Sequence, residues 1–289
     1  MRSVQWMAVC LLVLLFWVGG RLWADALTGD EILSRVDEQG EFVGEGSLIT
    51  TLRFETVHGD GTTSEYLFAA LGKREEGGKE SLLLYFLKPE DLEGMILLSI
   101  GSGGSKEESR IWLFSPGLEA FSPGAGLKEL VAEERKQSFA GSTLSREEIS
   151  GVFHFSEDYD AELSGEETLD IGGKAVPCYL LQIMAKPGAK VDHPAGRMWV
   201  AKETFLILRG EYLDDEGTLE RTMEILALGE FEGHVTIDAL VNRDISQKSS
   251  TTIYFEDRRR PSEEFPDALF SPDALPTFDP VGYGIKTGS

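Results

Sequence analysis

The sequence predicts a mainly β protein built on an antiparallel sheet. After residue 47 the chain passes through many short segments rich in apolar and β-branched residues, most of them separated by glycine-rich or Asp-Gly turns. Regular short strands with turn signals are typical of antiparallel sheets, whereas parallel sheets alternate strands with helices. Residues 81–87 and 95–100 are apolar on both faces, so their second face is either covered or lines an apolar cavity. From the pattern alone, an ordinary two-sheet sandwich core explains these strands equally well.

The chain begins with the pattern of a secretory signal peptide. Arg2 supplies a basic start, residues 7–18 form an unbroken apolar run, and Ala24 and Ala26 offer small residues to a signal peptidase. This run is shorter than the roughly 20 residues that span a bilayer. We therefore expect residues 1–26 to be removed, with cleavage at Ala24 or Ala26, and the mature protein to be exported without a stable membrane span. An uncleaved N-terminal anchor is the alternative.

A short helix precedes the strands. Thr28 and Glu31 fit a capping box, and Ile32, Leu33 and Val36 form an apolar stripe at helical spacing. The sequence thus predicts a helix over residues 28–38 that packs its apolar stripe across the sheet. The strands that follow are predicted at residues 48–57, 66–71, 81–87, 95–100, 110–114, 118–121, 159–171, 175–185, 197–201, 205–213, 219–228, 234–241 and 251–256.

Two segments interrupt the strands, and a tail follows them. Residues 127–137 carry apolar residues at helical spacing and predict a helix. Residues 142–149 predict a capped turn or short helix. Near the C-terminus, the apolar cluster at residues 265–270 is expected to dock on the fold, and the proline-rich tail over residues 276–289 is expected to be loose.

Composition limits the possible partners. The chain carries 27 basic and 50 acidic residues, a formal net charge of −23. Such a surface repels nucleic acid and anionic lipid headgroups, so no nucleic-acid partner is expected; solubility is the simpler explanation of the charge. Outside the predicted signal, Cys178 is the only cysteine, so no intrachain disulfide can form. Its apolar neighbours predict a buried, unreactive thiol.

The sequence carries no recognisable catalytic or metal-binding motif. The sequence contains neither a Gly-x-Ser-x-Gly elbow nor a pair of histidines at metal-ligand spacing. Acidic pairs are too common in this chain to indicate a site, because exposed carboxylates are usually solvated. The histidines are far apart in the sequence and in unlike contexts: His58, His154, His193 and His234. The sequence therefore predicts no enzyme, no metal site and no cofactor.

Aromatic side chains within the strands are the candidate ligand-binding residues. Phe54, Phe86, Trp112 and Phe114 are assigned to a cavity by strand alternation, so an error of one residue in register would turn each to the opposite face. Ordinary core packing explains each of them singly. As a set they would also suit a cavity that takes an acyl chain.

Several motifs then point to a known family. They are Arg-Ile-Trp-Leu-Phe-Ser-Pro at residues 110–116, Ser-Phe-Ala-Gly-Ser at residues 138–142, the acidic pair at residues 147–148, the strand pair at residues 196–209, and the segments at residues 250–257 and 266–271. Together they resemble the LolA-like family of outer-membrane lipoprotein-sorting proteins, in particular its longer branch, over about residues 28–275. Two features depart from that family: Thr143 stands where Asp is usual, and residues 123–137 form a longer segment.

The resemblance implies a curved antiparallel half-barrel with short helices plugging its open side, and an apolar cavity between sheet and helices. The LolA-like carrier domain would span residues 27–275. Phe139 would join the ligand-binding residues, because it lies in a motif expected to form a fixed turn beside the cavity. Gly141 would supply backbone freedom in this turn, and Ser142 would cap the short helix that follows.

The resemblance also implies a function. A periplasmic carrier or chaperone would bind the acyl chains of lipoproteins or lipids, receive them from an inner-membrane transporter and deliver them toward an outer-membrane acceptor. The alternative is a non-enzymatic sensory module that detects lipid or mislocalised lipoprotein with the same fold. An exported hydrolase is a third hypothesis, but it would need a nucleophile and a base that the sequence does not offer.

Overall fold

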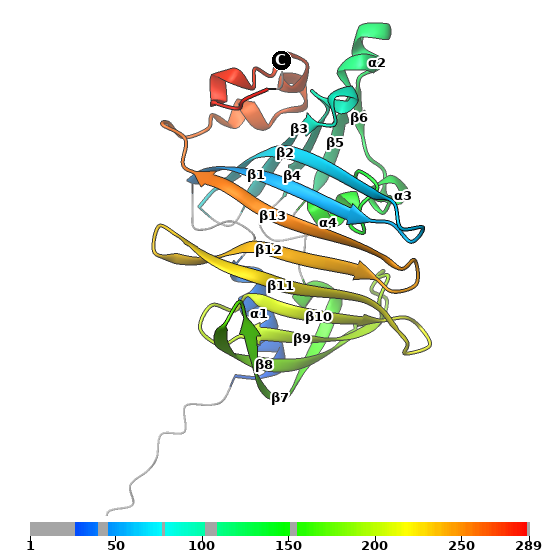
Figure 1. The fold of residues 1–289 in the computed structure, drawn as a ribbon, viewed down its shortest axis with the longest axis vertical. Coiled ribbons are helices and arrows are strands. Elements are labelled where there is room, and N and C mark those ends of the chain that lie inside the picture. The colour runs from blue at the N-terminus through cyan, green and yellow to red at the C-terminus, as the bar shows by residue number, and fades with distance from the viewer. Residues whose placement is uncertain (1–26, 40–45, 77–78, 102–108, 151–154, 288–289) are drawn as a thin grey trace, which may run out of the picture.

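A computed structural model describes residues 27–39, 46–76, 79–101, 109–150 and 155–287 (Figure 1). The predicted signal peptide and His154 lie outside the described residues. Among the described residues, no helix combines the length and hydropathy that crossing a bilayer requires.

Within these residues, thirteen strands form one antiparallel sheet. The strands are β1 (Gly46–Val57), β2 (Thr63–Arg74), β3 (Glu80–Lys88), β4 (Ile96–Ile100), β5 (Arg110–Phe114), β6 (Leu127–Glu129), β7 (Tyr159–Ile171), β8 (Lys174–Ala185), β9 (Ala195–Ala201), β10 (Ile207–Leu213), β11 (Leu219–Phe231), β12 (His234–Asp244) and β13 (Ser249–Arg259). Their order is β6-β5-β4-β3-β2-β1-β13-β12-β11-β10-β9-β8-β7. The chain thus builds outward from β1 to the β6 edge, crosses to the β7 edge, and returns strand by strand until β13 pairs with β1.

The sheet is open and strongly curved. Its edges, β6 and β7, do not pair with each other, yet Ile171 at the end of β7 shares a buried cluster with Ile225 of β11. Three strands separate β7 from β11 in the sheet order, so the sheet must curl for these side chains to meet. The predicted curved antiparallel half-barrel with short helices is confirmed.

The first helix, α1 (Gly29–Gln39), packs on one face of the sheet, as predicted. Its capping box forms: the Glu31 N–H donates to Thr28 Oγ1 at 3.2 Å, and the Thr28 N–H donates to the Glu31 carboxylate at 2.8 Å. Ile32 and Leu33 are fully buried and share a cluster with Met198 and other residues of β7 to β9. We call the face that α1 covers the inner face, and the opposite one the outer face.

Three other short helices complete the inner side: α3 (Ala132–Arg135), α4 (Arg146–Ile149) and α5 (Phe155–Asp158). Asp37 of α1 accepts hydrogen bonds from the backbone N–H groups of Phe155 and Ser156, both at 2.8 Å. This carboxylate satisfies donors that a helix N-terminus leaves unpaired, and it fixes α5 beside α1.

Two local predictions were wrong. Residues 118–121 are part of a helix, α2 (Pro116–Phe121), because Ser115 caps it and Pro116 stands at its first position. Residues 127–137 do not form one helix: Leu127–Glu129 is the edge strand β6, paired with β5, and α3 follows it. Here pairing with a neighbouring strand overrides a weak helical propensity, as tertiary context often does.

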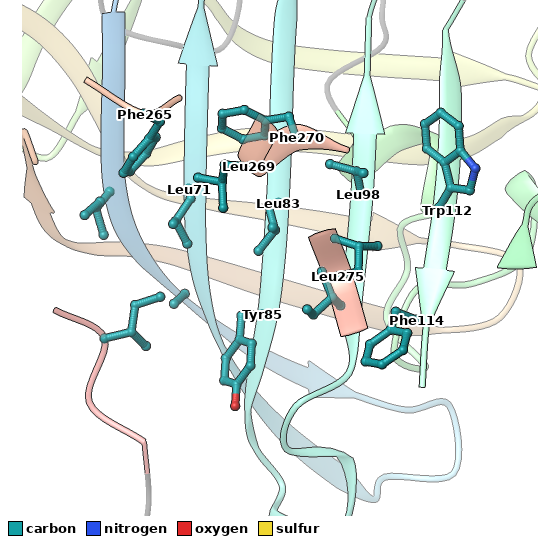
Figure 2. Close-up of a cluster of buried hydrophobic side chains, with 14 residues drawn as sticks. Leu71, Leu83, Tyr85, Leu98, Trp112, Phe114, Phe265, Leu269, Phe270 and Leu275 are labelled. Carbon is teal, nitrogen blue, oxygen red and sulfur yellow. The ribbon is translucent and has the colours of Figure 1, made fainter. Parts of the chain in front are cut away.

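The C-terminal segment, residues 260–287, covers the outer face of β1 to β5. It contains three short 3₁₀ helices, η3 (Asp267–Phe270), η4 (Pro272–Thr277) and η5 (Val281–Tyr283), after η1 (Glu90–Leu92) earlier in the chain. Figure 2 shows Leu269, Phe270 and Leu275 lying against Leu83 and Leu98 of the sheet. Strands apolar on both faces are thereby explained, since both of their faces are covered.

The prediction of a loose tail from residue 276 was therefore wrong. Phe278 stacks on Tyr283 with ring centroids 5.5 Å apart, and Ile285 is 5% exposed. These apolar side chains belong to or pack against the outer-face cluster. Proline content suggested looseness, but the burial of apolar area holds this segment in place.

Candidate functional site

Four phenylalanines form an aromatic cluster on the inner face. Phe54, Phe68 and Phe86 come from β1, β2 and β3, and Phe139 comes from the connection between β6 and β7. All four are at most 4% exposed. Ring centroids lie 5.1 Å apart for Phe54–Phe68, 4.7 Å for Phe68–Phe86 and 5.1 Å for Phe68–Phe139. Such spacings are favourable for edge-to-face and tilted rings.

Strand register brings the three sheet phenylalanines together. Phe68 lies directly opposite Phe86 in the β2–β3 pair and opposite Leu52 in the β1–β2 pair. Side chains that alternate along a strand share a face with every second residue, so Phe54 follows Leu52 on the same side. Other inner-face residues extend the apolar floor: Leu82, Leu84, Leu97, Ile111 and Ile253.

Phe139 is held over this floor by a fixed turn, as predicted. The Phe139 N–H donates to the Leu144 carbonyl at 2.8 Å, and the Ser142 N–H donates to the Phe139 carbonyl at 2.9 Å. Ala140 and Gly141 have φ values of 51° and 69°, in the left-handed region that glycine adopts most easily. This conformation turns the chain back and leaves Phe139 pointing at the cluster.

The predicted helix cap was displaced by three residues. Ser145, rather than Ser142, caps α4: its Oγ accepts from the Glu148 N–H at 3.1 Å, while the Glu148 carboxylate accepts from the Ser145 N–H at 2.6 Å. The Ser142 hydroxyl instead accepts from the Leu144 N–H at 3.2 Å within the turn. The Ser-x-x-Glu spacing of a capping box identifies Ser145.

A set of polar contacts ties this turn to the sheet; we call it the clasp. The Arg221 guanidinium of β11 forms an ion pair with Glu148 and donates to the Thr143 carbonyl. The Thr143 N–H donates to Thr251 Oγ1 at 2.9 Å, and its hydroxyl donates to the Asn242 carbonyl at 3.3 Å. Thr143, which stands where the resembled family usually has Asp, thus holds the turn through backbone and hydroxyl groups.

The clasp lies in a poorly solvated environment. The Arg221 and Glu148 side chains are only 16% and 19% exposed. Burial raises the pKa of the neighbouring Tyr212 to about 12, as expected for a phenol in surroundings that disfavour charge. A low local dielectric strengthens the pairing of opposite charges and makes an unpaired charge costly. The turn is therefore attached by a few strong contacts on one side and by apolar packing on the other.

The structure brings together three of the five predicted ligand-binding residues. Phe54, Phe86 and Phe139 belong to the aromatic cluster. Trp112 and Phe114 lie on the outer face, beneath the C-terminal segment near Leu275 (Figure 2). They cannot line one cavity with the other three, because residues 112 and 114 of β5 point away from Ile111, which faces inward.

Phe68 is the cluster residue that sequence reasoning did not select. It is fully buried and contacts each of the other three rings. The sequence feature that could have identified Phe68 is its position in the predicted strand at residues 66–71. A turn joins that strand to the predicted strand at residues 48–57. Pairing across this hairpin would have placed Phe68 opposite Leu52 and on the same face as Phe54.

A family model described as "uncharacterized protein"-like matches residues 78–277. The chain belongs to this family. No curated protein matches it.

Solved structures identify the fold as LolA-like. A DUF1329 family protein from Desulfovibrio piger has a TM-score of 0.71 at 24% identity, covering 86% of this chain and 97% of its own. A Vibrio parahaemolyticus domain described as a candidate outer membrane lipoprotein-sorting protein has a TM-score of 0.69 at 19% identity, with 86% and 98% covered. A LolA superfamily protein from Nitrosomonas europaea has a TM-score of 0.61 at 18% identity, with 86% and 99% covered. At these identities the likeness concerns the fold.

A separate hollow lies on the outer face of this LolA-like fold. It has a volume of about 1270 Å³ between β1, β2, β13 and the C-terminal segment. Ile49, Leu67, Ala69 and Leu87 line its apolar side. Its rim carries both signs of charge: Arg258, Arg259, Arg260 and Lys286 with Glu256, Asp257, Glu263, Glu264 and Asp279. This mixed lining suits a long acyl chain less well than the apolar floor around the aromatic cluster.

The described residues offer little catalytic chemistry. No group of three or more histidine, cysteine or acidic side chains among them could hold a metal ion. Cys178 is buried, and burial raises the pKa of its thiol, which favours the unreactive protonated form. The His58 ring lies 3.0 Å from the Ser64 hydroxyl in the β1–β2 hairpin, but Asp60 beside it bonds to Thr62. A serine–histidine contact without an orienting third group fits hairpin packing better than nucleophilic catalysis.

Proposed function

We propose that the protein is a periplasmic carrier or chaperone that holds acyl chains of lipoproteins or lipids against its inner face. The observation that carries this proposal is the aromatic cluster: its apolar floor is covered by Phe139 and by other side chains of the β6–β7 connection, such as Leu130 and Ile149, rather than by a second sheet. The LolA-like fold and the predicted signal peptide support the same function. Cargo would be received from an inner-membrane transporter and passed toward an outer-membrane acceptor.

The geometry suggests how an acyl chain binds. Phe54, Phe68 and Phe86 stand on neighbouring strands of a continuous sheet, so their positions are fixed. Phe139 stands on a turn that the clasp attaches to β11, β12 and β13. An acyl chain that displaces Phe139 replaces one apolar contact by another, and the sheet stays intact. Binding would then require the turn to move and no covalent chemistry, cofactor or metal.

Affinity in this proposal comes mainly from buried apolar area. Each Å² of apolar surface removed from water contributes about 25 cal/mol before ordering costs are subtracted. Because exposed charges act through a screened field, salt should change the affinity for a neutral acyl ligand little, despite the net charge of −23.

Titration with a neutral fluorescent acyl probe tests the proposal. We expect about one site per chain, and Phe86→Asp should weaken binding at least about tenfold, because a charge on the floor must be desolvated by the ligand. Trp112→Asp is the matched control. Trp112 is 5% exposed and Phe86 4%, but they lie on opposite faces, so Trp112→Asp should leave the affinity unchanged.

Both substitutions bury a charge, so folding is monitored by circular dichroism and the milder pair Phe86→Leu and Trp112→Leu is titrated in parallel. If the Phe86 and Trp112 substitutions weaken probe binding equally, the inner face is not the binding site. A wild-type protein that binds no acyl probe, after delipidation, would remove the carrier function itself.

A further inference from the structure

The short helix α2 carries two exposed apolar side chains. Phe121 is 89% exposed and Leu118 is 55% exposed. Residues three apart lie on the same side of a helix, so the two side chains form one apolar patch. Figure 1 shows α2 projecting past the ends of β5 and β6. We call residues 115–126, which contain α2 and the turn after it, the tip.

Hydrogen bonds within the tip fix its geometry. Ser115 caps α2, and the Ser115 N–H donates to the Gly126 carbonyl at 2.8 Å, which closes the base of the loop. The Glu119 carboxylate accepts from the Gly124 N–H at 2.9 Å and from the Gly126 N–H at 3.0 Å. At Gly126 a Cβ atom would lie 2.6 Å from Glu119 Cβ, so glycine is required for this close approach. These contacts hold Phe121 and Leu118 in water.

The tip is also nearly free of charge. Its sequence is Ser-Pro-Gly-Leu-Glu-Ala-Phe-Ser-Pro-Gly-Ala-Gly, and its one charged side chain, Glu119, is engaged by the loop's own backbone. Charged residues make up 27% of the whole chain, with a net charge of −23. Most of the surface therefore repels an anionic partner, and the tip is a place where apolar contact meets little electrostatic opposition.

The size of the patch distinguishes between two kinds of partner. Aromatic side chains bury roughly 150–250 Å² each, so two side chains offer on the order of 300 Å². A specific protein interface needs about 1,200 Å² or more. A bilayer surface makes no such demand, because individual apolar side chains insert independently below the headgroups.

We propose that the tip docks the protein on a lipid bilayer by inserting Phe121 and Leu118 into the interface. The binding is reversible, since two side chains give a weak anchor, and neutral bilayers are preferred to anionic ones. This inference concerns a site distinct from the inner face and does not depend on the proposed carrier function.

Flotation with phosphatidylcholine vesicles tests the docking on the chain from residue 27 onward, which carries the described fold. We expect Phe121→Ser to lower the vesicle partition coefficient about tenfold. Met184→Ser is the matched control, because Met184 is also apolar and 68% exposed but lies on β8; it should leave partitioning unchanged. Adding phosphatidylglycerol should weaken binding, and salt should partly restore it.

A fluorophore gives an independent readout of insertion. Cys178 is buried, so the new thiol of Phe121→Cys or of Met184→Cys can be labelled selectively with an environment-sensitive dye. Vesicles should shift the emission of the dye at residue 121 to the blue and leave the dye at residue 184 unchanged. Equal shifts at both positions, no shift at residue 121, or undiminished flotation of Phe121→Ser would each overturn the proposal. Because Phe121→Ser should bind the acyl probe as tightly as wild type, failure of docking is distinguishable from failure of the carrier function.

Discussion

Phe139→Ala is expected to lower the free energy of unfolding by about 3–5 kcal/mol, the range measured when a buried phenylalanine is truncated. Phe139 is 2% exposed and contacts Phe54, Phe68 and Phe86. Its removal leaves a cavity over a floor of strands that cannot collapse to fill it. Urea denaturation followed by circular dichroism measures the loss.

The same substitution separates stability from binding. If the Phe139 ring covers the acyl site, its truncation should raise the affinity for a neutral acyl probe while it destabilises the fold. Phe121→Ala is the matched control, since Phe121 is 89% exposed; it should change the free energy of unfolding by less than about 0.5 kcal/mol. A loss below about 1 kcal/mol for Phe139→Ala would place this ring outside the core.

Arg221→Met is expected to cost about 3 kcal/mol, because it leaves the poorly solvated Glu148 carboxylate without its cation. It also removes the hydrogen bond from the guanidinium to the Thr143 carbonyl. Loosening the clasp should free the Phe139 turn, so we expect acyl probe to associate severalfold faster. Chemical denaturation and stopped-flow fluorescence measure the two effects.

Arg243→Met is the control for Arg221→Met. Arg243 pairs with Glu224, and these side chains are 40% and 37% exposed, so their separation should cost less than about 1 kcal/mol. A double-mutant cycle between Arg221→Met and Glu148→Gln should show strong coupling. Additive losses, or equal losses from the two arginine substitutions, would show that the clasp does not hold the turn.

Sequence patterns within single strands predicted most of the fold. Tyr159–Ile171 and Arg110–Phe114 are strands at the bounds that alternation and turn residues predict. The capping box at Thr28 and Glu31 located α1. These signals are local, since each depends on residues a few positions apart. The curvature of the sheet was predicted only from the family resemblance, because the sequence of a single strand does not determine its register with a distant strand.

The parts that sequence reasoning missed depend on contacts between distant segments. Leu127–Glu129 is a strand only because β5 pairs with it. Trp112 and Phe114 were assigned to the inner cavity, but alternation in β5 alone gives two faces without saying which one turns inward. The C-terminal segment decides what covers the outer face, and its packing through Leu275 and Ile285 was obscured by its proline content.

The inner-face site was recovered in part for the same reason. Phe54 and Phe86 were selected because aromatic residues alternate in long strands, and Phe139 because of the family motif around it. Phe68, at the centre of the cluster, required the β1–β2 and β2–β3 registers together. The clasp joins Arg221 to Glu148, which are 73 positions apart in the chain. No local sequence pattern predicts such a pair.

Native mass spectrometry of the protein purified from the cells that produce it, followed by lipid extraction, asks directly whether the inner face holds an acyl chain. We expect about one acyl-bearing molecule per chain, reduced in Phe86→Asp and retained in Trp112→Asp. A protein that carries no extractable acyl chain, and that takes up none when offered lipid after delipidation, would contradict this expectation.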